Sequence, residues 1–264
     1  RHGIEVRPID VRFSDWNCTL ELYPNNPDKQ PAIRLGYRLI KGFQQACANR
    51  ISIARQHKAF FDVEDLCMRA DLNDAHQTLL ADASALKGIV GHRHRARWAI
   101  QGVEKQLPLF GGIAVRDAPV SLPMPTLGED VAADYTSVGL TLGKHPLALL
   151  RPQLRAQRCE RSRDLLKRNH GSQVRMAGLV TLRQRPETAG GATFVTLEDE
   201  DGMVNVVVWQ NVGERQRRVL LESQLMIVEG RWESADGVHH LIAGRLRDLS
   251  AMLGSITMPS RDFR

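Results

Sequence analysis

A β-hairpin is encoded between residues 193 and 209, in the run Thr193-Phe194-Val195-Thr196-Leu197-Glu198-Asp199-Glu200-Asp201-Gly202-Met203-Val204-Asn205-Val206-Val207-Val208-Trp209. Two stretches rich in β-branched residues flank the dipeptide Asp201-Gly202, which is a strong turn signal. Because side chains alternate between the faces of a strand, we expect Val195 and Leu197 inside the fold and Phe194 outside. The acidic run 198–201 then falls at the hairpin tip, where we expect it to be solvated.

Strand patterns continue on both sides of this hairpin. Val174, Met176, Val180 and Leu182 alternate with polar residues, and two more strands are predicted near 225–233 and 239–246. One helix is predicted over 214–222. Five short strands within about 80 residues, with a helix between the third and the fourth, predict a closed barrel of the oligonucleotide-binding type at 173–250.

The outer surface of this barrel is a candidate site for a single nucleic-acid strand. An outward aromatic side chain such as Phe194 can stack on a base, and arginines beside it can follow the phosphate backbone. The alternative for Phe194, Trp209 and Trp232 is packing against a neighbouring protein surface. The residues that we expect to contact a single strand are Arg175, Arg183, Phe194, Arg245 and Arg247.

Upstream of the barrel, residues 32–102 have a helical pattern. Helices are predicted over 44–57, from an Asp62 N-cap to Arg69, from an Asn73 or Asp74 cap to Ala81, and from His92 to about 103. Residues 1–31 are extended in character, 134–172 form a helical connector (with a helix predicted from about 148 to 169), and 251–264 form a tail.

Two glycine-rich corners interrupt this helical region, at Ile40-Lys41-Gly42-Phe43 and at Leu86-Lys87-Gly88-Ile89-Val90-Gly91. A helix that restarts after such a corner directs backbone N–H groups outward, where a phosphate can bind. Two corners about fifty residues apart predict a tandem helix-hairpin-helix unit that holds the DNA backbone irrespective of sequence. The alternative is an ordinary corner, with Gly42 as a C-cap. The predicted duplex contacts are Lys41, Gly42, Gly88, Gly91, Arg93 and Arg95.

Residues 103–133 are rich in Gly and Pro and are predicted to be a linker. Within it lies Gln106-Leu107-Pro108-Leu109-Phe110, whose apolar side chains have no local core and therefore suggest a partner pocket. The pentapeptide resembles the peptide by which bacterial polymerases and repair proteins hold the sliding clamp. By that resemblance Gln106 supplies amide hydrogen bonds, and Leu107, Leu109 and Phe110 fill apolar pockets. The alternative is that the segment packs back on its own domain.

Composition limits the possible functions. The chain has 264 residues, a net charge of +6 and a hydrophobic content of 42%, which suit folded domains and permit a polyanionic partner. No apolar run is long enough for a transmembrane helix, and no secretory signal is visible. Cys18, Cys47, Cys67 and Cys159 are scattered, which favours reduced thiols in a cytoplasmic protein over disulfides or a zinc site.

No catalytic motif is found. The sequence contains no GxxxxGK phosphate loop, no HExxH and no GxSxG. We therefore predict no active site and no metal or other cofactor bound to this chain itself. Because the chain opens on Arg1 and not on Met, we also expect it to be a piece of a longer protein.

Taken together, the motifs resemble the C-family DNA polymerases of bacteria, and within them the error-prone branch used in damage-induced mutagenesis. The resemblance runs through His2-Gly3-Ile4-Glu5-Val6-Arg7-Pro8, Asp10-Val11, Ser14-Asp15-Trp16, Leu35-Gly36, Ile40-Lys41-Gly42, Leu142-Gly143-Lys144-His145-Pro146-Leu147 and Val195-Thr196-Leu197-Glu198-Asp199 with Gly202. It implies that residues 1–31 end the fingers region, that 32–102 form the tandem helix-hairpin-helix domain, and that the fold class is α+β in several domains.

The same resemblance implies a role in translesion synthesis. The intact family protein is a DNA-directed DNA polymerase that uses magnesium, whereas this chain lacks the family's palm carboxylates and should be inactive alone. Implied partners are primer-template DNA, single-stranded template, the sliding clamp and an inactive Y-family polymerase homologue, with no membrane partner. Three alternatives stay open: a tRNA- or RNA-binding barrel module, a fragment of the replicative alpha subunit, and a scaffold whose barrel binds only protein.

Overall fold

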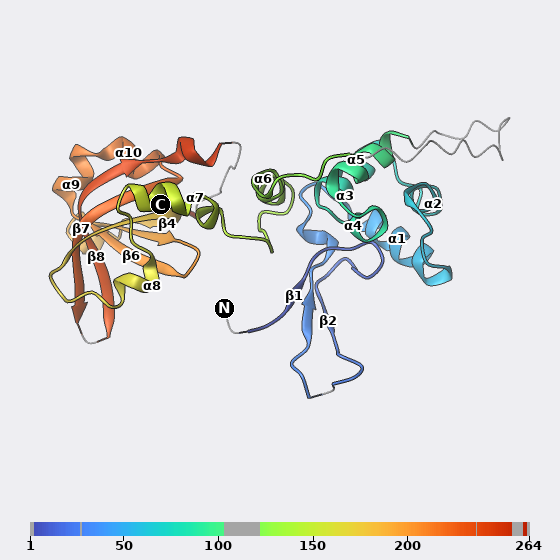
Figure 1. The fold of residues 1–264 in the computed structure, drawn as a ribbon, viewed down its shortest axis with the longest axis horizontal. Helices are drawn as coiled ribbons and strands as arrows, with labels where there is room; N and C mark the ends of the chain where they lie inside the picture. Colours follow the sequence, from blue (N-terminus) through green and yellow to red (C-terminus); the bar gives the residue numbers. More distant parts are fainter. Residues whose placement is uncertain (1–2, 27, 103–121, 236, 255–260, 263–264) are drawn as a thin grey trace. The chain divides into compact units, whose positions relative to one another are not determined.

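The computed structural model describes residues 3–26, 28–102, 122–235, 237–254 and 261–262. The chain divides into two compact units, Arg1–Leu142 and Gly143–Arg264, drawn in Figure 1. Each unit has its own apolar core, one built mainly from helices and the other from a barrel. The mixed α+β fold class predicted from the sequence is confirmed.

The first unit begins with a small sheet. Strands β1 (Val6–Arg7), β2 (Thr19–Glu21) and β3 (Ala32–Arg34) pair in the order β1-β3-β2, with β3 parallel to β1 and antiparallel to β2. The 3-10 helix η1 (Tyr37–Leu39) follows directly. The extended character predicted for residues 1–31 therefore corresponds to two strands that need β3 to complete their sheet.

Two helices of the first unit begin at their predicted caps. Asp62 accepts a hydrogen bond from the backbone N–H of Asp65, and Asn73 accepts one from that of His76, so both act as N-caps. Their buried faces share one core with the residues around η1. The helices are α1 (Gln45–His57), α2 (Val63–Arg69), α3 (Asp74–Asp82), α4 (Lys87–Val90) and α5 (Arg93–Gln101).

Part of the predicted linker is helical. Helix α6 (Leu127–Ser137) starts at a capping box, in which Thr126 and Glu129 each bond the other's backbone N–H. Val131 of this helix is buried. The prediction of a linker up to residue 133 was wrong from residue 127 onward, because the capping box starts a helix directly after Pro123 and Pro125.

The second unit opens with α7 (Pro146–Ala156) and the short helix α8 (Ser162–Leu165). A single helix from about 148 to 169 was therefore a wrong prediction. Pro146 starts α7 earlier, as a proline in the first turn often does. Arg158, with φ +59°, interrupts the helical run after residue 156.

The barrel contains the predicted strands. These are β4 (Gln173–Gln184), β5 (Thr193–Glu198), β6 (Met203–Val208), β7 (Leu225–Ala235) and β8 (Val238–Asp248). They pair in the order β5-β6-β8-β7-β4, and the β4–β5 pairing closes the ring. Helices α9 (Gln210–Arg215) and α10 (Arg217–Glu222) stand where one helix was predicted between the third and fourth strands.

A β-bulge in β4 changes which side chains face inward. The register against β5 shifts between Val180 and Leu182. Val180 faces the core and pairs with Leu197, whereas Arg183 pairs with the inward residue Val195 and is itself buried. Because a bulge moves all later side chains to the opposite face, simple alternation wrongly placed Arg183 on the outer surface.

The short elements η2 (Glu187–Ala189), η3 (Ser250–Leu253) and β9 (Arg261–Asp262) complete the unit, with β9 parallel to β4.

Candidate nucleic-acid interface

Both glycine corners have the geometry of a tight reversal between helical segments. Gly42 has φ +79° and precedes α1, and Gly91 has φ +94° and precedes α5. These left-handed values favour glycine. Both residues are exposed, and a Cβ atom placed at Gly91 would meet no atom within 4 Å. The backbone at this second corner is therefore open to a close approach by a ligand.

Gly88, the other glycine of the second corner, has a packing role. A Cβ atom placed there would collide with the guanidinium group of Arg12. That group forms a forked ion pair with Asp10. Gly88 therefore leaves room for the side chain of Arg12. This packing role was not predicted from the sequence, which assigned Gly88 only a contact with the duplex backbone.

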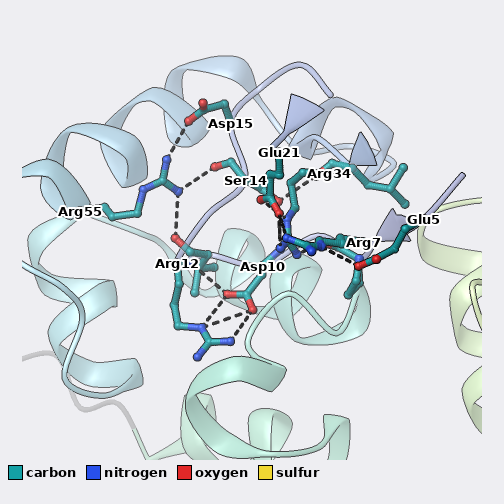
Figure 2. A network of polar contacts seen from close by, with 12 residues as sticks. Glu5, Arg7, Asp10, Arg12, Ser14, Asp15, Glu21, Arg34 and Arg55 are labelled. Atoms are coloured by element: carbon teal, nitrogen blue, oxygen red, sulfur yellow. Dashed lines mark hydrogen bonds and ion pairs between the residues drawn. The ribbon is translucent and has the colours of Figure 1, made fainter. Parts of the chain in front are cut away.

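The N-terminal segment is tied down by a network of arginines and carboxylates, shown in Figure 2. Arg34 and Arg7 both bind Glu21, which joins the strands of the small sheet. Arg55 of α1 donates to the carbonyl oxygens of Val11 and Ser14 and pairs with Asp15. These contacts join the strands of the small sheet to one another and hold residues 11–15 against α1.

Lys41 of the first corner is engaged within the protein. Its Nζ donates to the carbonyl oxygens of Tyr135 and Thr136, both at 2.9 Å. Its backbone N–H donates to the carbonyl oxygen of Ser137. These oxygens lie at the C-terminal end of α6, which attracts a cation. Lys41 therefore caps a helix while its side chain stays exposed, and its predicted phosphate contact stays a prediction.

Arg93 at the start of α5 is also bound to α6. Its guanidinium is 3% exposed and pairs with Asp130 at 2.7 Å and Asp134 at 2.5 Å. The prediction that Arg93 contacts DNA does not fit this burial. Helix α6 thus binds a cation from each of the two corners.

A smaller set of groups stays available beside the second corner. Lys87 and Arg95 are exposed, and neither has an ion pair or hydrogen bond from its side chain within the described part of the chain. Trp98, one turn further along α5, is 51% exposed. Lys87 and Trp98 were missed as site residues, although Leu86-Lys87-Gly88 repeats the Ile40-Lys41-Gly42 pattern.

Three of the arginines predicted to follow a single strand lie on one outer face, that of β4, β7 and β8. Arg175 and Arg245 flank Glu229 in register, and Arg247 pairs with Ile227, two residues along β7. Arg175 and Arg247 both donate to Gln157, which follows α7. Arg183 donates to the carbonyl oxygens of Leu220 and Ser223 at the end of α10. Of the predicted cations, only Arg245 is exposed without a contact among the residues that the structure describes.

The outer face of β5 and β6 keeps the predicted alternation. Val195 and Leu197 are buried, and Phe194 is half-buried beside its cross-strand neighbour Val207. Met203 on the same pair of strands is 67% exposed. The same face also carries the polar residues Thr196 and Asn205 and the carboxylate of Glu198, which pairs with Met203, so it is mixed in character.

The two tryptophans of the barrel unit differ. Trp232 is buried and stacks on His239 with ring centroids 5.6 Å apart. Trp209, which follows β6, is 51% exposed. Packing therefore accounts for Trp232, and a stacking role remains open for Trp209.

The acidic run 198–201 is not solvated as predicted. Asp199 is fully buried and accepts hydrogen bonds from the backbone N–H and the hydroxyl of Ser162. Glu200 pairs with Arg151 at 2.5 Å. Burial raises the pKa of Glu200, but the hydrogen bond and charge of Arg151 outweigh it, so its pKa is lower than usual. The run joins the hairpin to α7 and α8.

The clamp-like peptide, Gln106, Leu107, Leu109 and Phe110, lies outside the described residues. Helices within the described ranges include none long and apolar enough to span a membrane.

Comparison with known proteins agrees with both parts of the fold. Residues 3–96 match the helix-hairpin-helix motif family, and residues 174–249 match a family described as OB-fold nucleic acid binding domain. Among solved structures, asparaginyl-tRNA synthetase from Pyrococcus horikoshii is 24% identical over 30% of this chain and 20% of that one. Its TM-score of 0.26 is too low to support an argument about function.

The similar curated proteins are polymerases. An error-prone DNA polymerase of Pseudomonas fluorescens is 57% identical over 100% of this chain and 26% of its own length. One from Pseudomonas aeruginosa is 54% identical over 100% of this chain and 25% of its own length. The resemblance drawn from the sequence motifs is thereby confirmed. The chain is similar over its whole length to error-prone DNA polymerases, and it spans about a quarter of the length of these curated relatives.

Proposed function

We propose that this chain is the region with which an error-prone DNA polymerase holds its DNA during translesion synthesis. In this proposal the second glycine corner binds the duplex backbone and the barrel binds the single-stranded template. The observation that carries it is the open backbone at Gly91, flanked by the exposed cations Lys87 and Arg95.

The second corner suits a phosphate for electrostatic reasons. The start of α5 directs backbone N–H groups and the positive end of the helix dipole at the same place. Arg93 is withdrawn into its ion pairs with α6, so Lys87 and Arg95 supply the charge that meets the polyanion. Contacts of this kind read no base sequence.

The test is binding of a labelled 20-base-pair duplex, measured by fluorescence anisotropy over a range of salt concentrations. Lys87→Glu and Arg95→Glu should each weaken binding irrespective of the DNA sequence. Each should also lower, by about 1, the slope of the logarithm of the binding constant against the logarithm of the salt concentration. Lys58→Glu is a matched control, because Lys58 is exposed in the same unit and lies outside the corners. Equal losses in all three variants, or tighter binding of tRNA than of primer-template DNA, would contradict the proposal.

For the barrel, we propose that Phe194 stacks on a template base, with Arg245 beside the strand path. Phe194→Ala should weaken binding of oligo(dT) by about 1–3 kcal/mol. Phe61→Ala removes an aromatic ring that is 79% exposed in the other unit and should leave oligo(dT) affinity unchanged. If the two variants behave alike, the barrel face is not a single-strand site.

For the linker peptide, we propose that Gln106, Leu107, Leu109 and Phe110 bind the sliding clamp. Replacing Leu109 and Phe110 by Ala should abolish clamp binding, which we expect at about micromolar strength, while duplex affinity stays within twofold. Surface plasmon resonance on immobilised clamp measures the first quantity. Undiminished clamp affinity would exclude the tether.

The synthetic activity belongs to the longer family protein. We propose that its magnesium-dependent nucleotidyl transfer, and any cooperation with an inactive Y-family homologue, involve carboxylates and surfaces outside this chain. Primer extension with magnesium should therefore be undetectable for the chain alone. Measurable extension would overturn this division of roles.

A further inference from the structure

A pocket of about 230 Å3 opens in the barrel unit. Of the residues that the sequence predicted to contact a single strand, its described lining includes only the buried Arg183. It lies between the end of β4, the residues that lead into β5, and helices α9 and α10. Its wall combines cations, amides and leucines. The members that decide which ligand fits are Arg185, Gly191, Glu214, Arg217, Leu220 and Leu221.

The mouth of the pocket carries an excess of positive charge. Arg185 and Arg217 are exposed, and the described residues offer neither side chain a hydrogen bond or an ion pair. Glu214 is the one acidic residue among the described lining residues, and it accepts a hydrogen bond from Gln210 at 2.8 Å. Arg183, deeper in the wall, holds the end of α10. The two outer arginines can therefore bind an external anion.

One side of the pocket, formed by α10, is apolar. Leu220 is buried and Leu221 is 50% exposed, and both come from α10. Gly191, with φ +80°, keeps its side of the wall free of a side chain, and a Cβ atom there would collide with Gln210. A ligand that fills this space needs an apolar group next to its negative charges.

We propose that this pocket binds an acidic peptide segment of a partner protein, with an apolar side chain seated against Leu220 and Leu221 and carboxylates on Arg185 and Arg217. Charge complementarity and the leucine lining favour a peptide. Within the described ranges, the lining contains no aromatic or histidine ring. A nucleotide base would therefore find no aromatic ring to stack on, although stacking on such rings supplies much of the affinity for single strands.

The test uses the complete chain and the fluorescein-labelled peptide Gly-Ser-Asp-Glu-Asp-Leu-Phe. Two further peptides separate the charge and the apolar contributions: in one Lys replaces each acid, and in the other Ser replaces Leu-Phe. We expect saturable binding of the first peptide and at least fivefold weaker binding of the other two. Equal binding of all three peptides, or no binding of the first, would overturn the proposal.

Variants locate the binding. Arg217→Ala and Leu221→Ser should each lower the affinity for the acidic peptide at least fivefold. Arg218→Ala should not, because Arg218 is the next residue of α10, pairs with Glu222 and does not line the pocket. Circular dichroism confirms that the variants are folded. The pocket is not a peptide site if Arg218→Ala lowers the affinity for the peptide as much as Arg217→Ala does. The same conclusion follows if Arg217→Ala lowers the affinity for oligo(dT) and leaves that for the peptide unchanged.

Discussion

At the scale of single residues, Arg151 shows how the barrel unit orders the hairpin of β5 and β6. The guanidinium of this α7 residue is 4% exposed, forms a forked contact with Glu200 and lies 3.7 Å from Asp199. Asp199 in turn binds Ser162 and the backbone N–H groups of Asp201 and Gly202. Because buried charges are costly unless they are paired, each member holds the others in place.

This pairing predicts a pH dependence. The lowered pKa of Glu200 means that its contribution to stability is present above its ordinary value of 4.5 and is lost as the pH falls through the folded-state pKa. Glu200→Gln should lower the free energy of unfolding by about 3 kcal/mol at pH 7. Below pH 4.5, the unfolding free energy of this variant should depend less on pH than that of the parent protein. Urea titrations between pH 3 and pH 7 measure both effects.

The control for this prediction is Glu222→Gln, which removes an exposed carboxylate paired with Arg218 on α10. Its unfolding free energy should stay within about 0.5 kcal/mol of the parent. If the unfolding free energy of Glu200→Gln falls with decreasing pH as steeply as that of the parent protein, the pair with Arg151 does not control stability in acid.

At the scale of elements, α6 connects the two glycine corners. Its C-terminal carbonyl oxygens hold Lys41, and its carboxylates hold Arg93. Residues just after it, Val138 and Leu140, pack on the same core. The helix therefore links the two corners and fixes the distance between them.

The change that tests this role is the double variant Asp130→Asn and Asp134→Asn. It leaves the Arg93 charge buried without a carboxylate, so we expect a loss of about 3 kcal/mol in unfolding free energy of the first unit. Hydrogen exchange should also become faster in α6. Arg95→Met, on the exposed side of α5, serves as the control and should leave both quantities unchanged.

Local signals predicted most of these elements, and long-range contacts explain the exceptions. Asp62 and Asn73 cap their helices through bonds within three residues, so sequence spacing was sufficient. The bulge that turns Arg183 inward depends on pairing with β5. The partners of Arg93 lie 37 and 41 residues away, and no local pattern could reveal that its charge was already neutralised.

At the scale of the whole molecule, the division into two units with separate cores has a consequence for binding. The proposed duplex site belongs to one unit and the proposed single-strand site to the other. A primer-template junction offers both kinds of strand at once. Joining two weak sites in one chain raises the affinity for such a junction without any new contact.

The chain should therefore bind a primer-template with a 12-nucleotide overhang about a hundredfold more tightly than either residues 3–142 or residues 143–264 bind it alone. Because each half contains a complete core, both should fold, which thermal unfolding checks. The advantage should vanish on a blunt duplex, where the barrel has no strand to bind. If instead the joined chain binds no better than its stronger half, the two units do not act on the same DNA, and only one of the proposed sites can account for its affinity.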